Sequence, residues 1–379
     1  MANINYYFDS VSTTKPYPEV LELYNKLSNK YYANSDALYQ IGVEAYKLLE
    51  QARKRICDIC GYRDNELIFT SGASEANNFV FKGVVLANLK KKIHIITSAY
   101  EHSSIINNCK QLERLFDNVE ITYLKPDDRG KITVELLLEA LRDNTVLVSI
   151  MTVNNEVGAI NDIDELAAVV KKRSKAYFHS DITQALGKLK LDLSNVDLAS
   201  FSAHKFHGLK GCGGLFKKQH IHLETLITAG QQEFGMRGGT SDYLSIMTMA
   251  KALIISNDQM VENNHKLDLL MKELEGSLSD IEGIKIVLPK YHINNLLLIT
   301  TPLTSEVMLN ALNKKNIFVS SKSTCGTRSD EESVTAKALA YDGNRAIRIS
   351  LLPEMEVDDI KYLVENIKEA IEFYGKIKL

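Results

Sequence analysis

The expected fold and site are centred on residues 200–205, Ser-Phe-Ser-Ala-His-Lys. They close an apolar run, Val196–Phe201, which predicts a buried strand. A glycine-rich run, Gly-Leu-Lys-Gly-Cys-Gly-Gly, follows at 208–214. Most lysines at strand ends are ordinary surface residues. A lysine at the mouth of a parallel sheet, before a sharp glycine turn, can instead present its amine to a ligand, which makes Lys205 the first candidate functional residue.

Around this stretch, strands and helices alternate from residue 66 onward. This pattern predicts an α/β fold with a mainly parallel sheet of seven strands. The expected strands are 66–70, 93–97, 120–124, 146–151, 177–180, 198–202 and 214–216. The expected helices include 75–89, 103–115, 134–141 and 163–173, after two earlier helices, one opening at Pro16 and Pro18 and one at 40–60.

The pattern changes after about Met260. A long helix, 263–278, precedes short strands at 285–288 and 296–300 and helices near 305–313 and 357–374. We interpret this part as a smaller α+β domain. The expected boundaries are 15–258 for the large domain, and 1–14 with 259–379 for the small one.

Further polar residues follow other predicted strands. Asp181 ends the strand that begins at Tyr177, and a polar run, Thr70–Asn78, follows the strand at 66–70. Ligands of parallel sheets bind at the carboxyl ends of the strands. The candidate residues therefore predict one shared site there.

Together these motifs resemble the pyridoxal-phosphate (PLP) site of fold-type I enzymes, and specifically the NifS/IscS-type cysteine desulfurases of the class V aminotransferase family. The resemblance implies that Lys205 forms the Schiff base with PLP. It also implies that a carboxylate, Asp181, keeps the ring nitrogen protonated, as the cofactor needs to act as an electron sink.

The resemblance assigns the remaining cofactor contacts residue by residue. Ala73 and Ser74, at a strand-to-helix turn, would hold the phosphate, although any helix N-terminus can bind anions and an ordinary N-cap is an equal alternative. His102 would stack on the pyridine ring and move protons. Hydrogen bonds to the ring's phenolic oxygen and to substrate are assigned to Gln184 and Asn155, and further phosphate contacts to Ser202 and His204.

The stretch 235–240, Gly-Met-Arg-Gly-Gly-Thr, resembles the family's Gly-x-Arg-x-Gly-Thr. There the threonine reaches the cofactor of the neighbouring subunit. The resemblance thus implies a homodimer in which Thr240 completes the partner's site.

A polar segment, 319–333, is expected to form a mobile loop around Cys325. It resembles the family's Ser-Ser-x-Ser-x-Cys, whose cysteine takes sulfur from the substrate as a persulfide. Lys322 stands where the family has glycine, and we expect its charge to favour the Cys325 thiolate. Downstream, Arg348 is expected to bind the substrate carboxylate through two hydrogen bonds, which a lysine cannot reproduce.

Composition limits the other function classes. The formal net charge of −3 and pI near 6.3 give no general attraction to nucleic acid or acidic membrane. We see no signal peptide and no run long enough to span a bilayer, so a cytoplasmic protein is expected. The five cysteines suggest reduced thiols. Cys57 and Cys60 could suggest a redox pair or half a zinc site, but two cysteines in a helical core are the better interpretation and no metal site is expected.

The sequence therefore predicts a PLP-dependent desulfurase that converts L-cysteine to L-alanine and passes sulfur from Cys325 to an acceptor, such as an iron–sulfur scaffold or a tRNA-thiolation enzyme. The alternatives are a selenocysteine lyase, another class V aminotransferase-type enzyme, or a non-catalytic sulfur-relay paralogue. Two segments, 33–42 and 229–235, differ from the family pattern, the second by Phe234 in place of arginine.

Overall fold

The computed structural model describes residues 5–321 and 334–376. Its larger sheet has seven strands in the order β2-β8-β7-β6-β5-β3-β4. Only β8 runs antiparallel to its neighbours, β2 and β7. The strands are β2 (Leu67–Thr70), β3 (Ile93–Ser98), β4 (Val119–Leu124), β5 (Thr145–Ser149), β6 (Tyr177–Asp181), β7 (Leu198–Ser202) and β8 (Gly213–Lys217).

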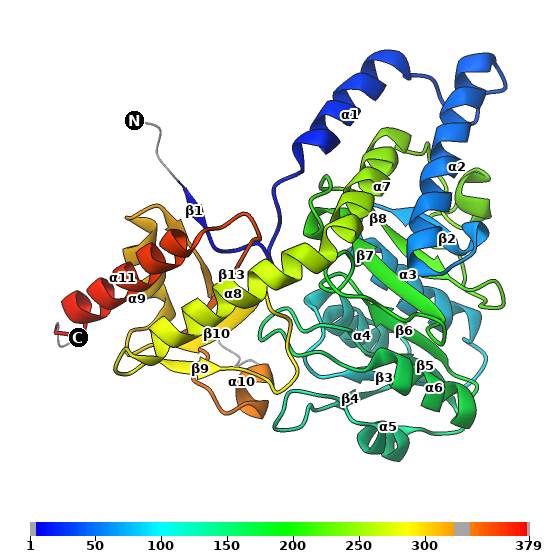
Figure 1. The fold of residues 1–379 in the computed structure, drawn as a ribbon. Coiled ribbons are helices and arrows are strands. Elements are labelled where there is room, and N and C mark those ends of the chain that lie inside the picture. Colours follow the sequence, from blue (N-terminus) through cyan, green and yellow to red (C-terminus); the bar gives the residue numbers. More distant parts are fainter. Residues whose placement is uncertain (1–4, 322–333, 377–379) are drawn as a thin grey trace.

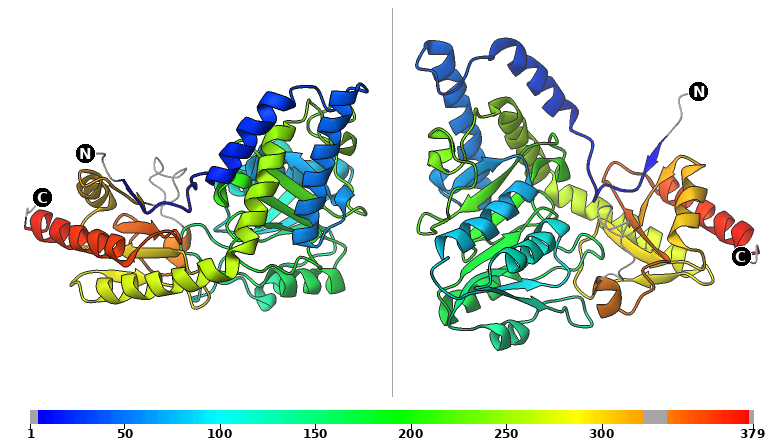
Figure 2. Two further views of the ribbon diagram at one scale, coloured as in Figure 1. Left: turned by 45° about the horizontal axis from the view of Figure 1, so that its top comes forward. Right: turned by 180° about the vertical axis from the view of Figure 1, so that it is seen from behind.

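Helices cover both faces of this sheet, because its strands carry apolar residues on both sides. On β2, Phe69 packs into the core beneath α2 and α7, whereas Ile68 packs with α3 and α4 on the opposite face. Figures 1 and 2 show this three-layer arrangement. The helices are α1 (Pro18–Lys30), α2 (Gln40–Cys60), α3 (Ala73–Ala87), α4 (Ser103–Leu115), α5 (Val134–Ala140), α6 (Ile163–Arg173) and α7 (Tyr243–Asp258).

A second, antiparallel sheet of four strands lies beside the first, in the order β12-β13-β10-β9. It packs on helices α8, α9 and α11 around a separate hydrophobic core. Its elements are α8 (Met260–Ser279), β9 (Lys285–Val287), β10 (Leu296–Thr300), α9 (Ser305–Asn313), β12 (Ser320–Ser321), α10 (Val334–Ala338), β13 (Ala346–Ser350) and α11 (Val357–Tyr374).

The N-terminal strand β1 (Tyr6–Tyr7) belongs to this second unit, since it pairs in parallel with β11 (Ile317–Phe318). The chain then crosses to the large sheet through residues 8–17, as the blue segment in Figure 1 shows. At the other crossing, α8 follows α7 with only Gln259 between them.

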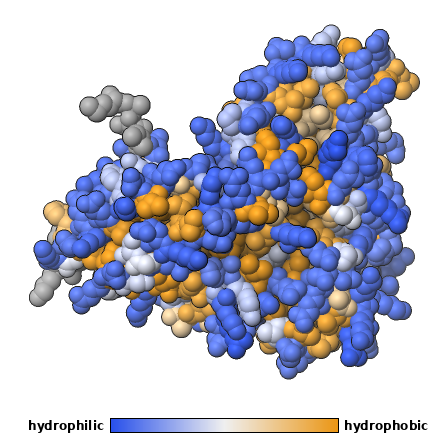
Figure 3. Space-filling view, viewed as in Figure 1, coloured by the Kyte–Doolittle hydropathy of each residue, from blue (hydrophilic) through white to orange (hydrophobic). Residues whose placement is uncertain are grey.

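The predicted fold class, a mainly parallel seven-stranded sheet with a smaller α+β unit, is confirmed. The boundary at 258/259 stays a prediction. Hydrophilic residues cover most of the face in Figure 3. Among residues 5–321 and 334–376, no helix is both long and apolar enough to cross a membrane.

Candidate active site

A cavity of about 460 Å³ opens at the carboxyl ends of the parallel strands. The folding of strands from distant parts of the chain brings ten of the predicted site residues to its wall. They are Ala73, Ser74, His102, Asn155, Asp181, Gln184, Ser202, His204, Lys205 and Arg348. The roles assigned to them from the sequence stay predictions, but their convergence on one cavity follows from the parallel sheet.

Lys205 ends a short 3₁₀ turn, Ala203–Lys205, directly after β7. Its Nζ donates hydrogen bonds to the backbone carbonyls of Val11 and Ser12, both at 2.7 Å. These carbonyls belong to the crossing segment from the N-terminus. The segment thus forms part of the cavity wall and fixes the position of the amine.

The turn between β2 and α3 packs closely against Ser202 at the end of β7. Gly72 has a φ of +146°, and a Cβ there would lie 3.1 Å from the Ser202 hydroxyl. That hydroxyl accepts a hydrogen bond from the Ala73 N–H at 2.8 Å. The N-cap residue of α3, Gly72, has no side chain of its own to cap the helix. The helix N-terminus therefore faces the cavity with its partial positive charge, which suits an anion.

Asp181 is buried at the end of β6, with 5 % of its surface exposed. Its Oδ2 accepts a hydrogen bond from Asn77 at 2.9 Å, and its Oδ1 accepts one from the Thr183 N–H at 3.0 Å. Two donors stabilise a carboxylate at this position. A cationic ring nitrogen would find an anionic acceptor here.

His102 is the N-cap residue of α4. Its Nδ1 lies 2.8 Å from the Ser104 hydroxyl and accepts a hydrogen bond from the Ser104 N–H at 3.2 Å. Burial lowers the pKa of His102, with Asp181 opposing the shift and Lys205 adding to it. The imidazole is therefore held neutral near pH 7, with Nδ1 as the acceptor and Nε2 carrying the proton.

Arg348, in the middle of β13, brings the only guanidinium among the described cavity-lining residues. One terminal nitrogen donates to the Asn155 carbonyl at 2.7 Å, and the other to Asp9 at 2.9 Å and Ser12 at 2.7 Å. Its Nε is buried without a hydrogen-bond partner. A buried donor without an acceptor is costly.

Two predicted contacts have other neighbours in this structure. The Gln184 amide donates to the Val11 carbonyl at 3.1 Å and accepts from Lys188 at 3.2 Å. Nδ1 of His204 bonds Thr13 at 3.0 Å. Burial and the nearby charges of Lys205, Lys210 and Lys188 lower the pKa of His204 to about 4, so its ring is neutral at pH 7.

Thr240 does not line this cavity; it is exposed on the loop that follows Arg237. Its predicted role concerns a second subunit. Lys322 and Cys325 lie outside the described residues. Cys57 and Cys60 lie in α2, where burial raises both thiol pKa values, that of Cys57 to about 12. No group of three or more metal-binding side chains occurs within the described ranges.

Several residues that line or support the cavity were not predicted from the sequence. Lys210 and Thr183 line it directly, and Asn77 bonds Asp181. Lys210 lies in the glycine-rich run and Asn77 in the polar run after β2, so the motifs contained both. Spacing alone gave no sign of their partners, because those lie on other strands.

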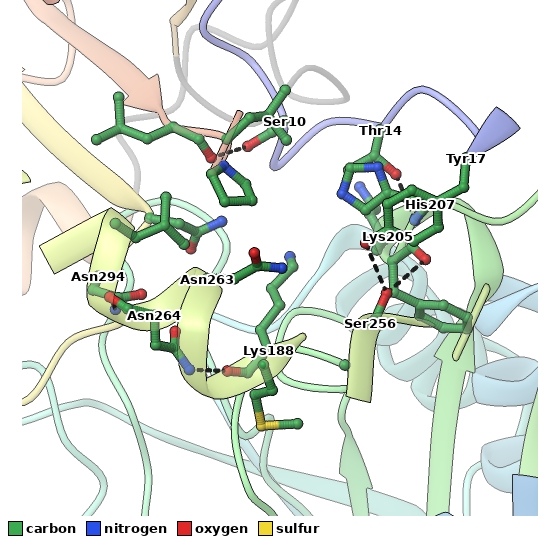
Figure 4. A pocket seen from close by; sticks show the side chains of 18 residues that line it. Ser10, Thr14, Tyr17, Lys188, Lys205, His207, Ser256, Asn263, Asn264 and Asn294 are labelled. Carbon is green, nitrogen blue, oxygen red and sulfur yellow. Dashed lines mark hydrogen bonds between the residues drawn. The ribbon is translucent and has the colours of Figure 1, made fainter. Parts of the chain in front are cut away.

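A second, smaller cavity of about 50 Å³ shares Lys205 with the first. Figure 4 shows Lys188 and Lys205 on its wall, together with Asn263 and Asn264 of α8. The Asn264 amide donates to the Lys188 carbonyl at 2.9 Å. This contact ties the start of α8 to the loop after β6.

The sequence family described as aminotransferase class-V matches residues 6–363. The chain belongs to this family. Among its class-V relatives, cysteine desulfurase IscS of Clostridium botulinum (strain Kyoto / Type A2) is 34 % identical over 386 residues, covering 98 % of this chain and 95 % of the relative. Cysteine desulfurase IscS of Histophilus somni (strain 129Pt) is 37 % identical over 343 residues, covering 88 % and 84 %.

Solved structures agree with the fold. A NifS-like protein superimposes with a TM-score of 0.91 at 31 % identity, covering 98 % of this chain and all of that one. A structure described as SspA in complex with cysteine has a TM-score of 0.80 at 30 % identity, covering 92 % and 99 %. The resemblance expected from the motifs is therefore confirmed across almost the whole chain.

Proposed function

We propose that this class-V family member is a PLP-dependent cysteine desulfurase that converts L-cysteine to L-alanine. The observation that carries the proposal is the opening of the Lys205 amine and the Arg348 guanidinium onto one cavity. Relatives named as cysteine desulfurases and a related structure described as a cysteine complex support it.

The residues of the cavity fit pyridoxal phosphate. The helix N-terminus at Ala73 and Ser74, which line the cavity beside Ser202, suits the phosphate. Asp181 suits a protonated ring nitrogen, and neutral His102 suits the ring face. Lys205 would carry the cofactor. The bound cofactor would supply a conjugated electron sink at the substrate α-carbon.

The chain's own groups then have distinct tasks. Arg348, which lines the cavity, binds the substrate carboxylate and orients the amino acid. The Lys205 amine removes the α-proton, since the N-terminal carbonyls already hold it at the cavity wall. Asp181, held by Asn77 and the Thr183 N–H, would pair with the ring nitrogen. Gln184 and Asn155 line the wall between these groups.

We propose Cys325 as the residue that accepts the sulfur, because its segment resembles the family's Ser-Ser-x-Ser-x-Cys. Its thiolate would attack the substrate sulfur, forming an S–S bond as the carbon–sulfur bond breaks. The electron pair remains with the former β-carbon, which takes a proton, and the Lys205 ammonium returns the α-proton to complete alanine. The sulfur stays on Cys325 as a persulfide. A cytoplasmic acceptor protein, such as a scaffold or a tRNA-thiolation enzyme, would remove it.

The deciding assay incubates the PLP-loaded protein with L-cysteine and measures alanine, with mass spectrometry for an added sulfur on Cys325. We expect alanine and a persulfide from wild type, alanine loss in Lys205→Ala, and persulfide loss in Cys325→Ser. A keto acid in place of alanine would instead identify an aminotransferase. Wild type that binds PLP but forms no alanine would contradict the proposal.

We further propose a homodimer in which Thr240 reaches the neighbouring cofactor. A surface next to the loop that carries Thr240 exposes Leu38 and Tyr46 beside Gln231 and Gln232. Leu38 is 95 % exposed. Such apolar side chains gain by being covered. Light scattering should give twice the 42.5 kDa chain mass, and Leu38→Glu should weaken this association.

A further inference from the structure

A chain of buried polar side chains runs behind the candidate site, away from the cavity. It connects Asp181 to Asn77 of α3, to Ser200 of β7, and to His179 of β6, which contacts Ser149 of β5. Asn77, His179, Ser200 and Ser149 are all fully buried. The proposed mechanism uses none of the four directly.

The direction of each hydrogen bond follows from the carboxylate at one end. Asp181 can only accept, so Asn77 must turn its NH₂ group toward it, at 2.9 Å. The Asn77 carbonyl oxygen then faces Ser200, which donates its only hydroxyl proton to it. The Ser200 oxygen is left to accept a bond from its remaining neighbour, His179.

This requirement selects one tautomer of His179. Its Nε2 lies 3.1 Å from the Ser200 oxygen and must carry the proton. Its Nδ1 then accepts from the Ser149 hydroxyl at 2.8 Å. Burial lowers the pKa of His179 to about 4, with Asp181 opposing the shift, so the ring is neutral at physiological pH. The opposite tautomer would reverse the Ser200 bond and turn the Asn77 oxygen toward Asp181.

The Asn77 NH₂ group has a second hydrogen to donate, and this bond lies on the His102 side of the site. It reaches the Ser104 hydroxyl at 2.9 Å. Ser104 then has its proton free for Nδ1 of His102, 2.8 Å away. One buried amide is thus bonded to the partner of His102 and to Asp181, the two side chains expected to face the cofactor ring.

We propose that Asn77 is a positioning residue that fixes Asp181 and the Nε2–H tautomer of His102 together, and that His179 and Ser200 fix the orientation of Asn77. This proposal rests on the proposed function for its catalytic meaning. The hydrogen-bond order itself is a property of the protein without cofactor.

The first test uses the wild-type apoprotein, labelled with ¹⁵N at its nine histidines. Long-range proton–nitrogen NMR spectra distinguish the tautomers, with His179→Asn and His102→Asn providing the assignments. We expect Nε2–H for both His102 and His179 between pH 7 and 8. An Nδ1–H form of His179 would overturn the proposal, whether or not the protein forms alanine.

The second test compares Asn77→Asp with Asn88→Asp, the same change about 16 Å farther along α3. The carboxylate at position 77 cannot donate to Asp181 and repels it. We expect Asn77→Asp to weaken PLP binding at least ~10-fold and to shift the pH midpoint of the bound cofactor's visible absorption by about one unit. We expect Asn88→Asp to resemble wild type.

Unchanged PLP affinity, absorption midpoint and His102 tautomer in Asn77→Asp would overturn the proposal. If that variant does not fold, Ser200→Ala serves in its place and is expected to change the tautomer populations of His179. Failure of the proposed function would be seen separately, as correct tautomers and PLP binding without alanine from L-cysteine.

Discussion

Arg53 of α2 and Glu233 form a buried bidentate ion pair, with nitrogen–oxygen distances of 2.9 and 3.0 Å. Glu233 also accepts the Phe69 N–H at 2.8 Å, and Arg53 donates to the Leu67 carbonyl. The side chains are 2 % and 3 % exposed. The pair therefore anchors the loop that leads to Thr240 onto strand β2.

Phe234, next in the chain after Glu233, packs its ring against this ion pair. Its ring lies 4.9 Å from the Arg53 guanidinium carbon, and Glu233 and Phe234 both have positive φ values, +49° and +60°. Such a backbone is strained for residues other than glycine. The buried ion pair and the ring contact offset that strain.

Replacing Glu233 by glutamine should leave a buried cation without its counter-charge. We expect a loss of about 3–5 kcal/mol in the free energy of unfolding. Glu50→Gln removes the other carboxylate bonded to Arg53, at 3.1 Å, but that carboxylate is 32 % exposed and should cost less than about 1 kcal/mol. Urea unfolding followed by circular dichroism measures both; equal losses would contradict the assignment.

Arg348→Lys tests substrate binding. A lysine keeps the charge but cannot make the fork-shaped contact with a carboxylate. We expect kcat/KM for L-cysteine to fall about 100-fold, or ~2.7 kcal/mol. Arg345→Lys is the matched control, since its side chain is 51 % exposed and pairs with Asp342. Similar kinetics for the two variants would rule out Arg348 as the carboxylate-binding residue.

Lys188→Met should change how stability depends on pH. Burial, and then the Lys205 charge, lower the Lys188 pKa from 10.5 to about 7. Between these values the unfolded chain holds a proton that the folded chain has released, so wild-type stability rises with pH. At pH 6.5 the buried ammonium is charged and unfavourable, and the variant should melt at least about 2 °C higher.

The advantage of Lys188→Met should shrink as the pH is raised toward 9. Scanning calorimetry from pH 6 to 9 measures the difference, in which other titrating groups cancel. The control is Lys190→Met, an exposed neighbour, whose melting temperature should follow wild type. A constant difference between Lys188→Met and wild type across the range would show that Lys188 does not titrate there.

Gly213→Ala tests the close approach of β8 to the turn before α3. A Cβ there would meet the Phe201 carbonyl and lie 2.7 Å from the Gly72 Cα. We expect about 1–3 kcal/mol of destabilisation and weaker PLP binding. At Gly276 of α8 a Cβ meets nothing within 4 Å, and Ala there should stabilise by roughly 0.5–1 kcal/mol. Thermal unfolding measures both. A higher melting temperature for Gly213→Ala than for Gly276→Ala would show that β8 does not pack closely against this turn.

The sequence by itself determined the order of the strands along the chain and the candidate residues at their ends. Helix 103–115 and strand 198–202 have the bounds that their apolar periodicity predicted. The spacing of apolar residues and the positions of turn-forming residues are local features of the sequence. They can therefore be recognised without knowing which elements pack together. The motif resemblance also identified Lys205, Asp181 and Arg348, which all line the cavity.

Only the tertiary structure decided which groups meet across elements. The Lys205 amine bonds to Val11, 194 residues away, and Arg53 pairs with Glu233, 180 residues away. Asn77 reaches Asp181 because α3 packs over the end of β6. Such contacts depend on the order of strands in the sheet and on where the N-terminal segment packs. Both are set by contacts between residues far apart in the sequence. Local sequence patterns contain no information about these distances, and hence none about the proton order behind the site.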